Sequence, residues 1–286
     1  MRKYVLLTDS GADLSEDVLK RWHIVSLPLH AQFEGEDEFS DYDIDSAKFY
    51  KKMREGKIAK TSAVNNTAFL NEFRALAKRG LDVLYIGLSS AISSTYSAAS
   101  TAARSLKKEL PEREILTLDS KCASAGLGLL LYLTAEKRDK GADINEAYEY
   151  AKSIAPRICH RFTVDNLTYL YRGGRISGAS AFWGNIIGIK PLLYVDSGGF
   201  LKPSEKVRGR RGAIEALAES YGILASEGEN CIFISHADCP EDAELLNEFL
   251  YAKYGCQASR IFDIGAVIGA HAGPGTLALF FIADTR

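Results

Sequence analysis

The sequence predicts an α/β protein of two domains, an N-terminal α/β domain on a parallel sheet and a C-terminal α+β domain. The chain has 286 residues, enough for two domains of ordinary size. In the first half short apolar runs alternate with helical patterns, which is typical of parallel strands joined by right-handed crossovers. In the second half, hairpin patterns mix with helices. We place the boundary near Pro156, so the expected domains are residues 1–156 and 157–286.

The first half begins with an apolar run that predicts a strand over residues 3–7. Its polar turn leads to a helix near Ser15, where a hydroxyl precedes acidic residues as at a typical N-cap. Further strands are expected at residues 24–29, 81–86 and 114–118. Helices are expected at residues 46–55, 67–79, 95–110, 123–140 and 144–158. The acidic stretch 31–46 indicates little regular structure beyond a short hairpin around Gly35.

The second half has a different pattern, because two of its apolar runs flank the turn Ser197-Gly198-Gly199 and predict a hairpin. Strands are expected at residues 160–164, 192–195, 200–203, 231–235, 260–264 and 277–282. Helices are expected from residue 165 to 171 and over residues 211–224 and 240–254.

Composition narrows the function classes. The chain is 47% hydrophobic and 25% charged, as in globular proteins, and its net charge of -2 gives no reason to expect nucleic acid as a partner. The first apolar run ends at Leu7, too early for the core of a signal peptide, so we expect a cytoplasmic protein. The five cysteines are scattered without a CxxC pair, so neither a disulfide framework nor a metal site is expected.

The most informative segment is the turn after the strand at residues 81–86. It carries five hydroxyl side chains within the seven residues 89–95. One helix cap needs one hydroxyl, and open α/β sheets bind ligands at the carboxyl ends of their strands. A helix N-terminus there also favours an anion. The turn therefore predicts an anion site, for which Thr61 or Ser62 is a second candidate donor if the two do not simply cap a helix.

Three further polar segments lie in the second half. Arg172 and Arg175 flank two glycines, and arginine suits carboxylate or phosphate. The basic run 206–211 is either part of a site or a solvated face. His271 stands in the small-residue loop 268–275, which lacks the Gly-Lys-Ser/Thr of a P-loop. His271 is a ligand-binding residue, a structural histidine, or a general base for a loop serine, although no Gly-x-Ser-x-Gly elbow is present.

Together these segments resemble the DegV family of bacterial fatty-acid-binding proteins, in order along essentially the whole chain. The matching segments are Thr8-Asp9-Ser10, Lys60-Thr61-Ser62, residues 88–96, Phe162-Thr163-Val164-Asp165 through Leu170, Arg172-Gly173-Gly174-Arg175-Ile176, Lys190-Pro191, Lys206-Val207-Arg208 and His271-Ala272-Gly273-Pro274-Gly275. Two positions depart from the family pattern. Val64 stands where a proline is usual, and Ser94 stands where a glycine is usual.

The resemblance implies a DegV-like fold with a long-chain fatty acid buried between the domains and no catalytic residue or cofactor. It implies carboxylate binding by Thr61, Ser62, Ser93, Ser94 and His271, with Arg172, Arg175 and Arg208 in supporting or rim positions. The expected partner is a fatty acid kinase, a DhaK-like ATP-binding protein that makes acyl-phosphate for phospholipid synthesis. Contact with a membrane would be transient. A serine–histidine acyl hydrolase or transferase and a phospho-ligand sensor are the alternatives.

Two groups of side chains are candidates for the outer parts of such a site. The rim that would meet the kinase is Arg172, Arg175, Lys206, Arg208, Arg210 and Arg211. Each buried CH₂ of an acyl chain contributes about 0.8 kcal/mol, so the tail needs an apolar tunnel. Candidate lining residues are Phe182, Trp183, Ile186, Ile187, Leu192, Leu193, Phe280 and Phe281, each of which could equally be ordinary core.

Overall fold

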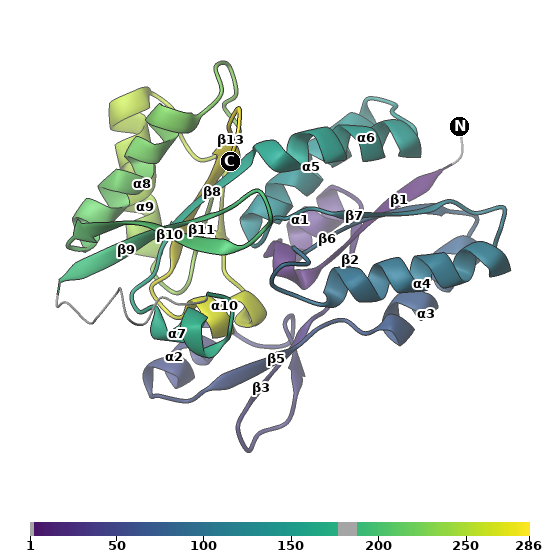
Figure 1. Cartoon of the computed structure of the whole chain (residues 1–286), viewed down its shortest axis with the longest axis horizontal. Coiled ribbons are helices and arrows are strands. Elements are labelled where there is room, and N and C mark those ends of the chain that lie inside the picture. Colours follow the sequence, from purple (N-terminus) through teal and green to yellow (C-terminus); the bar gives the residue numbers. More distant parts are fainter. Residues whose placement is uncertain (1–2, 177–187) are drawn as a thin grey trace.

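The computed structural model describes residues 3–176 and 188–286 and confirms the predicted α/β class (Figure 1). The first half contains a four-stranded, all-parallel sheet in the order β2-β1-β6-β7. Its strands are β1 (Tyr4–Asp9), β2 (Ile24–Leu27), β6 (Asp82–Gly87) and β7 (Ile115–Asp119). Every residue of β6 is buried, as expected of a central parallel strand that helices cover on both faces.

Helices cover both faces of this sheet. α3 (Asn66–Lys78) and α4 (Thr95–Glu109) pack together on one face, and α5 (Ala125–Asp139) and α6 (Ile144–Ile154) on the other (Figure 1). The short helix α1 (Glu16–Arg21) connects β1 to β2. The loop between β6 and α4 is thus the predicted hydroxyl-rich turn, at the carboxyl end of a central strand.

The second half forms a six-stranded sheet in the order β10-β9-β8-β13-β11-β12, antiparallel except for the last pair. Its strands are β8 (Ile158–Thr163), β9 (Ile189–Val195), β10 (Leu201–Arg208), β11 (Phe233–His236), β12 (Arg260–Asp263) and β13 (Leu277–Ile282). α8 (Arg210–Leu224) and α9 (Pro240–Tyr254) cover its outer face, and α5 packs on its inner face (Figure 1).

Strand β13 shows why this sheet is apolar on both faces. Leu277, Leu279 and Phe281 pack into the core under α8 and α9. The alternate residues Ala278, Phe280 and Ile282 pack into the larger core shared with the first half. Because side chains alternate along a strand, burial on both faces requires the uninterrupted apolar run that the sequence has here.

A third, small sheet in the order β4-β3-β5 lies beside the second half. It consists of β3 (His30–Phe33), β4 (Phe39–Ser40) and β5 (Ala59–Ser62), and α2 (Ser46–Arg54) joins β4 to β5. The hairpin expected around Gly35 is present as β3–β4, and Gly35 has a φ of +79°, where glycine is favoured. Strand β5 was not predicted, because its sequence Ala-Lys-Thr-Ser has no apolar run.

The loop predicted around His271 was wrong, and the strand expected at residues 200–203 is longer than predicted. The segment expected as a loop around His271 contains α10 (Ala266–Ala272), so His271 lies in the last turn of a helix rather than in a glycine loop. The basic run begins in a strand, because β10 extends to Arg208, and it ends in the first turn of α8. Short α10 is rich in small residues and lacks the polar face of an ordinary surface helix.

The boundary expected near Pro156 falls in the 3₁₀ turn Ala155–Arg157, directly before β8. One continuous apolar core includes side chains from both sides of this point, for example Leu129 and Phe233. The division into two domains therefore stays a prediction. Within the described residues, no helix combines the length and the apolar character needed to cross a membrane.

Candidate functional site

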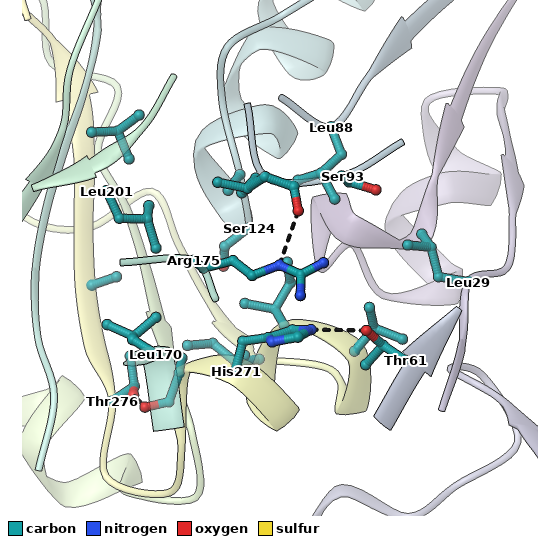
Figure 2. Close-up of a pocket in the computed structure, with 18 of the residues that line it drawn as sticks. Leu29, Thr61, Leu88, Ser93, Ser124, Leu170, Arg175, Leu201, His271 and Thr276 are labelled. Carbon is teal, nitrogen blue, oxygen red and sulfur yellow. Dashed lines mark hydrogen bonds between the residues drawn. The ribbon is translucent and has the colours of Figure 1, made fainter. Parts of the chain in front are cut away.

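A pocket lies between the two halves, and most of its wall is apolar (Figure 2). The first half contributes the loop after β6, and the second half contributes β8, β13 and α10. The apolar lining residues are Leu29, Ala63, Leu88, Ile92, Ala123, Phe162, Leu170, Val195, Leu201, Ile264, Val267, Ile268, Ala272, Ala278 and Phe280. The pocket is thus suited to an apolar ligand with a small polar end.

All five residues predicted to bind a carboxylate line this pocket, although they come from three separate segments. Thr61 and Ser62 end β5, Ser93 and Ser94 precede α4, and His271 lies on α10. The structure therefore brings together the hydroxyl segments of the first half and the histidine of the second.

Thr61 and His271 are joined directly across the two halves. Thr61 Oγ1 and His271 Nε2 are 2.8 Å apart (Figure 2). The other ring nitrogen, Nδ1, is buried and makes no hydrogen bond, and it faces the backbone of Gly173 so closely that a Cβ there would lie 2.2 Å away. An N–H at Nδ1 would therefore be a buried donor without an acceptor. We infer that the neutral ring carries its proton on Nε2 and donates it to Thr61, whose own hydroxyl hydrogen is then available to a ligand.

The electrostatic surroundings keep the His271 ring neutral. Burial lowers the pKa of His271 from 6.5 to about 4, and the positive charge of Arg175 lowers it further in the same direction. Among the described residues, the guanidinium of Arg175 is thus the charge that acts on the pKa of this ring. A ligand that carries a negative charge would reverse the second of these effects.

Arg175 lies inside the pocket rather than at its rim. Its Nε donates to the carbonyl of Ile92 at 3.0 Å, and Nη1 donates to the carbonyl of Gly173. Figure 2 shows its guanidinium between His271 and the loop that carries Ser93. No described carboxylate pairs with it or lines the pocket. The pocket therefore holds a partly buried positive charge with no counter-charge.

The serines of the loop after β6 divide into two groups. Ser89 is fully buried and donates to the carbonyl of Gly199 at 3.1 Å, and Ser90 donates to Asp119. These two hydroxyls hold the loop in place. Ser93 accepts from the backbone N–H of Thr95 and contacts its hydroxyl at 2.9 Å, so Thr95 can donate to Ser93 and leave the Ser93 hydrogen for a ligand.

Ser94 and Ser62 line the pocket with more solvent contact. Ser94 is exposed at the start of α4, and its hydroxyl makes no capping hydrogen bond. Its φ of -81° is ordinary, so the backbone does not require glycine at this position. Ser62 is also exposed, and its hydroxyl donates to Glu38 rather than toward the other polar groups. Val64, the other departure from the family pattern, is buried in the core.

Hydrogen bonds to the carboxylate of Asp9 hold the hydroxyl loop after β6 in position. This carboxylate accepts hydrogen bonds from Tyr85 at 2.6 Å and from the backbone N–H of Leu88 at 3.1 Å. Burial raises the pKa of Asp9 to about 6, while these hydrogen bonds lower it. The polar turn at residues 8–10 therefore supports the site and does not line it.

The other predicted rim arginines do not line the pocket. Arg172 is exposed on α7 (Thr168–Arg172), 5.2 Å from the ring of Tyr169. Arg208 is exposed at the end of β10, seven residues beyond the lining residue Leu201, or about 23 Å along a strand. Arg210 is engaged with Asp242 at 2.7 Å, so its charge is already paired within the protein.

Of the apolar residues predicted to line a tunnel, Phe280 does so. Leu192, Leu193 and Phe281 are core residues instead. Phe182, Trp183, Ile186 and Ile187 lie outside the described residues.

Three polar lining residues were not predicted from the sequence. Ser124 follows β7 at the same edge of the parallel sheet as the hydroxyl loop, and this position could have identified it. His160 and Phe162 are two residues apart on β8, so their side chains lie on the same face of the strand and both line the pocket. Burial lowers the pKa of His160 to about 3, and its Nε2 accepts from the backbone N–H of Ala123. Thr276 gave no signal in the sequence; it donates to the carbonyl of Ala272.

Comparison with known proteins agrees with the resemblance in the sequence. Residues 3–284 match the family model described as "Uncharacterised protein, DegV family". A DegV domain-containing protein from Clostridium perfringens is 39% identical over 289 residues, which cover 100% of this chain and 99% of that protein.

Two solved structures have the same fold. A Thermotoga maritima protein described as having a fatty acid binding function has a TM-score of 0.85 and 30% identity, and the match covers 99% of this chain and 100% of that one. A DegV family protein from Thermus thermophilus, described by its fatty acid binding, has a TM-score of 0.87 and 27% identity over 98% of this chain and 99% of that one.

Proposed function

This chain belongs to the DegV family, and we propose that it binds a long-chain fatty acid in the pocket between its two halves. The observation that carries the proposal is the guanidinium of Arg175, which has no described carboxylate partner in a pocket whose wall is mostly apolar. A partly buried charge without a counter-charge is unfavourable, and a ligand with an anionic head group and an apolar tail would complement both this charge and the apolar wall.

The head group would lie where the two hydroxyl segments meet. With the His271 proton on Nε2 and Thr95 donating to Ser93, the hydroxyls of Thr61 and Ser93 can both donate to a ligand, and Arg175 supplies the positive charge. Hydrogen bonds from such donors to a carboxylate contribute about 1.5–3 kcal/mol each. Ser62, Ser94 and His271 complete the proposed carboxylate site, His271 through its hydrogen bond to Thr61.

We further propose that the protein is a carrier without catalytic activity. In a serine hydrolase, a histidine takes the proton of the nucleophile while a carboxylate holds its other nitrogen. Here Nε2 of His271 is bonded to Thr61, and Nδ1 faces Gly173 without any described carboxylate partner. This arrangement favours binding over hydrolysis.

The proposed role of the carrier is to present the carboxylate to a separate fatty acid kinase, which forms acyl-phosphate for phospholipid synthesis. Exposed basic residues outside the pocket would contact the kinase. Arg172 and Arg208 are the best candidates, whereas Arg210 is already paired with Asp242.

The binding proposal is tested by mass spectrometry of lipid extracted from the purified protein and by titration with palmitate. We expect bound fatty acid, and we expect Ser93→Ala and Thr61→Ala each to cost about 1–3 kcal/mol of binding free energy without unfolding the chain. Ser97→Ala is the matched control, because Ser97 is an exposed serine on the adjacent helix α4 that does not line the pocket. Unchanged palmitate affinity in both pocket variants would refute the head-group assignment.

The kinase proposal is tested by reconstitution with the cognate kinase. Arg208→Glu should slow acyl-phosphate formation, more at low salt than at high salt, while fatty acid stays bound. Val207 neighbours it in β10 but is partly buried and uncharged, so Val207→Ala is a control for the strand itself. Turnover by Arg208→Glu equal to that of the wild type at both salt concentrations would rule out Arg208 as a contact.

A further inference from the structure

The segment that leads into α10 belongs to the second half of the chain but is held by side chains of the first half. The buried hydroxyl of Tyr50, on α2, donates to the carbonyl of Ile264 at 2.7 Å. Asp13 accepts from the backbone N–H of Gly265 at 2.9 Å. Asp41 accepts from the backbone N–H of Val267 at 3.0 Å. Three side chains distant in sequence thus bind the backbone of three residues within the short segment 264–267.

The packing around this segment is equally close. A Cβ at Gly265 would lie 3.0 Å from Asp41 Oδ1 and 3.1 Å from Asp13 Oδ1, so the two carboxylates approach the Gly265 backbone together. A Cβ at Gly269 would lie 2.3 Å from the hydroxyl of Tyr50. Because glycine has no Cβ, side chains of the first half can contact the backbone of α10 directly at both positions.

We propose that Asp13, Asp41 and Tyr50 are positioning residues, which hold α10 from the opposite half of the chain and thereby keep His271 against Thr61. Val267 lies one helical turn before His271. A hydrogen bond to the N–H of Val267 therefore positions the helical turn that carries the imidazole. α10 has only seven residues, and a helix that short has little stability of its own. Its placement therefore depends on these side chains.

The charges around the cluster explain why carboxylates suit this role. Burial raises the pKa of Asp13 and of Asp41. The two carboxylates lie near each other, and Asp13 also lies near Asp263 and Asp41 near His30. Arg260, Asp17 and Tyr42 line the adjacent surface hollow. None of the described basic residues forms an ion pair with Asp13 or Asp41, so backbone N–H groups and the hydroxyl of Ser124 stabilise these carboxylates. An asparagine retains an oxygen acceptor at the same place.

The test uses histidine-labelled protein, because only five histidines are present and His271→Gln assigns the signal of interest. In the protein without ligand, Asp41→Ala should move the imidazole signals of His271 toward those of a solvent-exposed ring, whereas Asp41→Asn should leave them near wild type. Tyr50→Phe, which removes only the hydroxyl, should act in the same direction as Asp41→Ala. Asp82→Ala is the control, since Asp82 is a buried carboxylate of the same half that accepts from Glu114 away from the pocket.

The affinity measurement rests on the proposed function and separates positioning from general destabilisation. Asp41→Ala should weaken palmitate binding about tenfold in the wild type but less than about twofold in a His271→Ala background, because coupled residues are not additive. An Asp41→Ala effect on His271 no larger than that of Asp82→Ala, or an undiminished loss in the His271→Ala background, would overturn the inference. If the wild type fails to bind palmitate, the proposed function fails, and the imidazole signals of the unliganded variants still decide the positioning role.

Discussion

Binding of a fatty acid should raise the pKa of His271, and this change reports directly on where the carboxylate lies. In the unliganded protein burial and Arg175 lower this pKa from 6.5 to about 4. A carboxylate bonded to Thr61 would lie about 5 Å from the imidazole, where one opposite charge contributes about 3 kcal/mol at an effective dielectric constant of about 20. That energy is a factor of about a hundred in proton affinity, enough to return the pKa close to its ordinary value.

The sign of the linked pH effect follows from this change. His271 would hold its proton more tightly in the complex than in the free protein. Palmitate affinity should therefore increase as the pH falls, by about fivefold between pH 8 and 5.5. The assay is a titration of the His271 imidazole signals by NMR with and without palmitate, together with affinities at both pH values. His271→Gln is the control and should lose the pH dependence. A His271 pKa that stays at about 4 in the complex would mean that the head group binds elsewhere.

Three further changes have defined outcomes. Gly173→Ala should weaken palmitate binding measured by calorimetry, since its Cβ would lie 2.2 Å from His271 Nδ1 and push the ring away; unchanged affinity would contradict this contact. Gly199→Ala should lower the melting temperature, because its φ is +85° and its Cβ would meet the hydroxyl of Ser89 at 2.2 Å; a wild-type melting curve would show that this hairpin turn is not rigid. Burial lowers the pKa of His160 to about 3 in the folded protein, whereas its value in the unfolded chain is 6.5. The free energy of unfolding should therefore decrease as the pH falls below 6.5, by about 2 kcal/mol at pH 5. Urea unfolding at pH 7 and 5 should show a smaller difference for His160→Gln than for wild type, and equal differences would disprove this assignment.

The elements with strong periodic signals were predicted correctly from the sequence. Strand β6 is an apolar run that ends in hydroxyls, and its loop lies at the expected edge of a parallel sheet. The hydroxyl loop could also be identified as a candidate site from the surplus of donors beyond one cap. The sequence could not show which serines support the loop and which face the pocket. That distinction depends on hydrogen-bond partners that are distant along the chain, such as Gly199 and Asp119.

The errors share a physical cause. Strand β5 and helix α10 have weak local signals, since one is short and polar and the other is short and built of small residues. Tertiary contacts decide both structures: β5 pairs with β3, and α10 is held by Asp41 and its neighbours. Arg175 was predicted as a supporting or rim residue, and the sequence could not decide between the two, because only the fold shows that its guanidinium turns inward to Ile92.

The polar side of the pocket is also the contact between the two halves of the chain. Thr61 bonds to His271, Arg175 bonds to the carbonyl of Ile92, and Ser89 bonds to the carbonyl of Gly199, and each of these bonds joins the first half to the second. A carboxylate placed among Thr61, Ser93 and Arg175 would add a further link and neutralise the one unpaired charge there. Ligand binding and closure of the two halves would then be the same event, so a ligand that binds only the folded state should raise the melting temperature with its concentration. If the protein binds a fatty acid in this way, release of the ligand would require the two halves to separate.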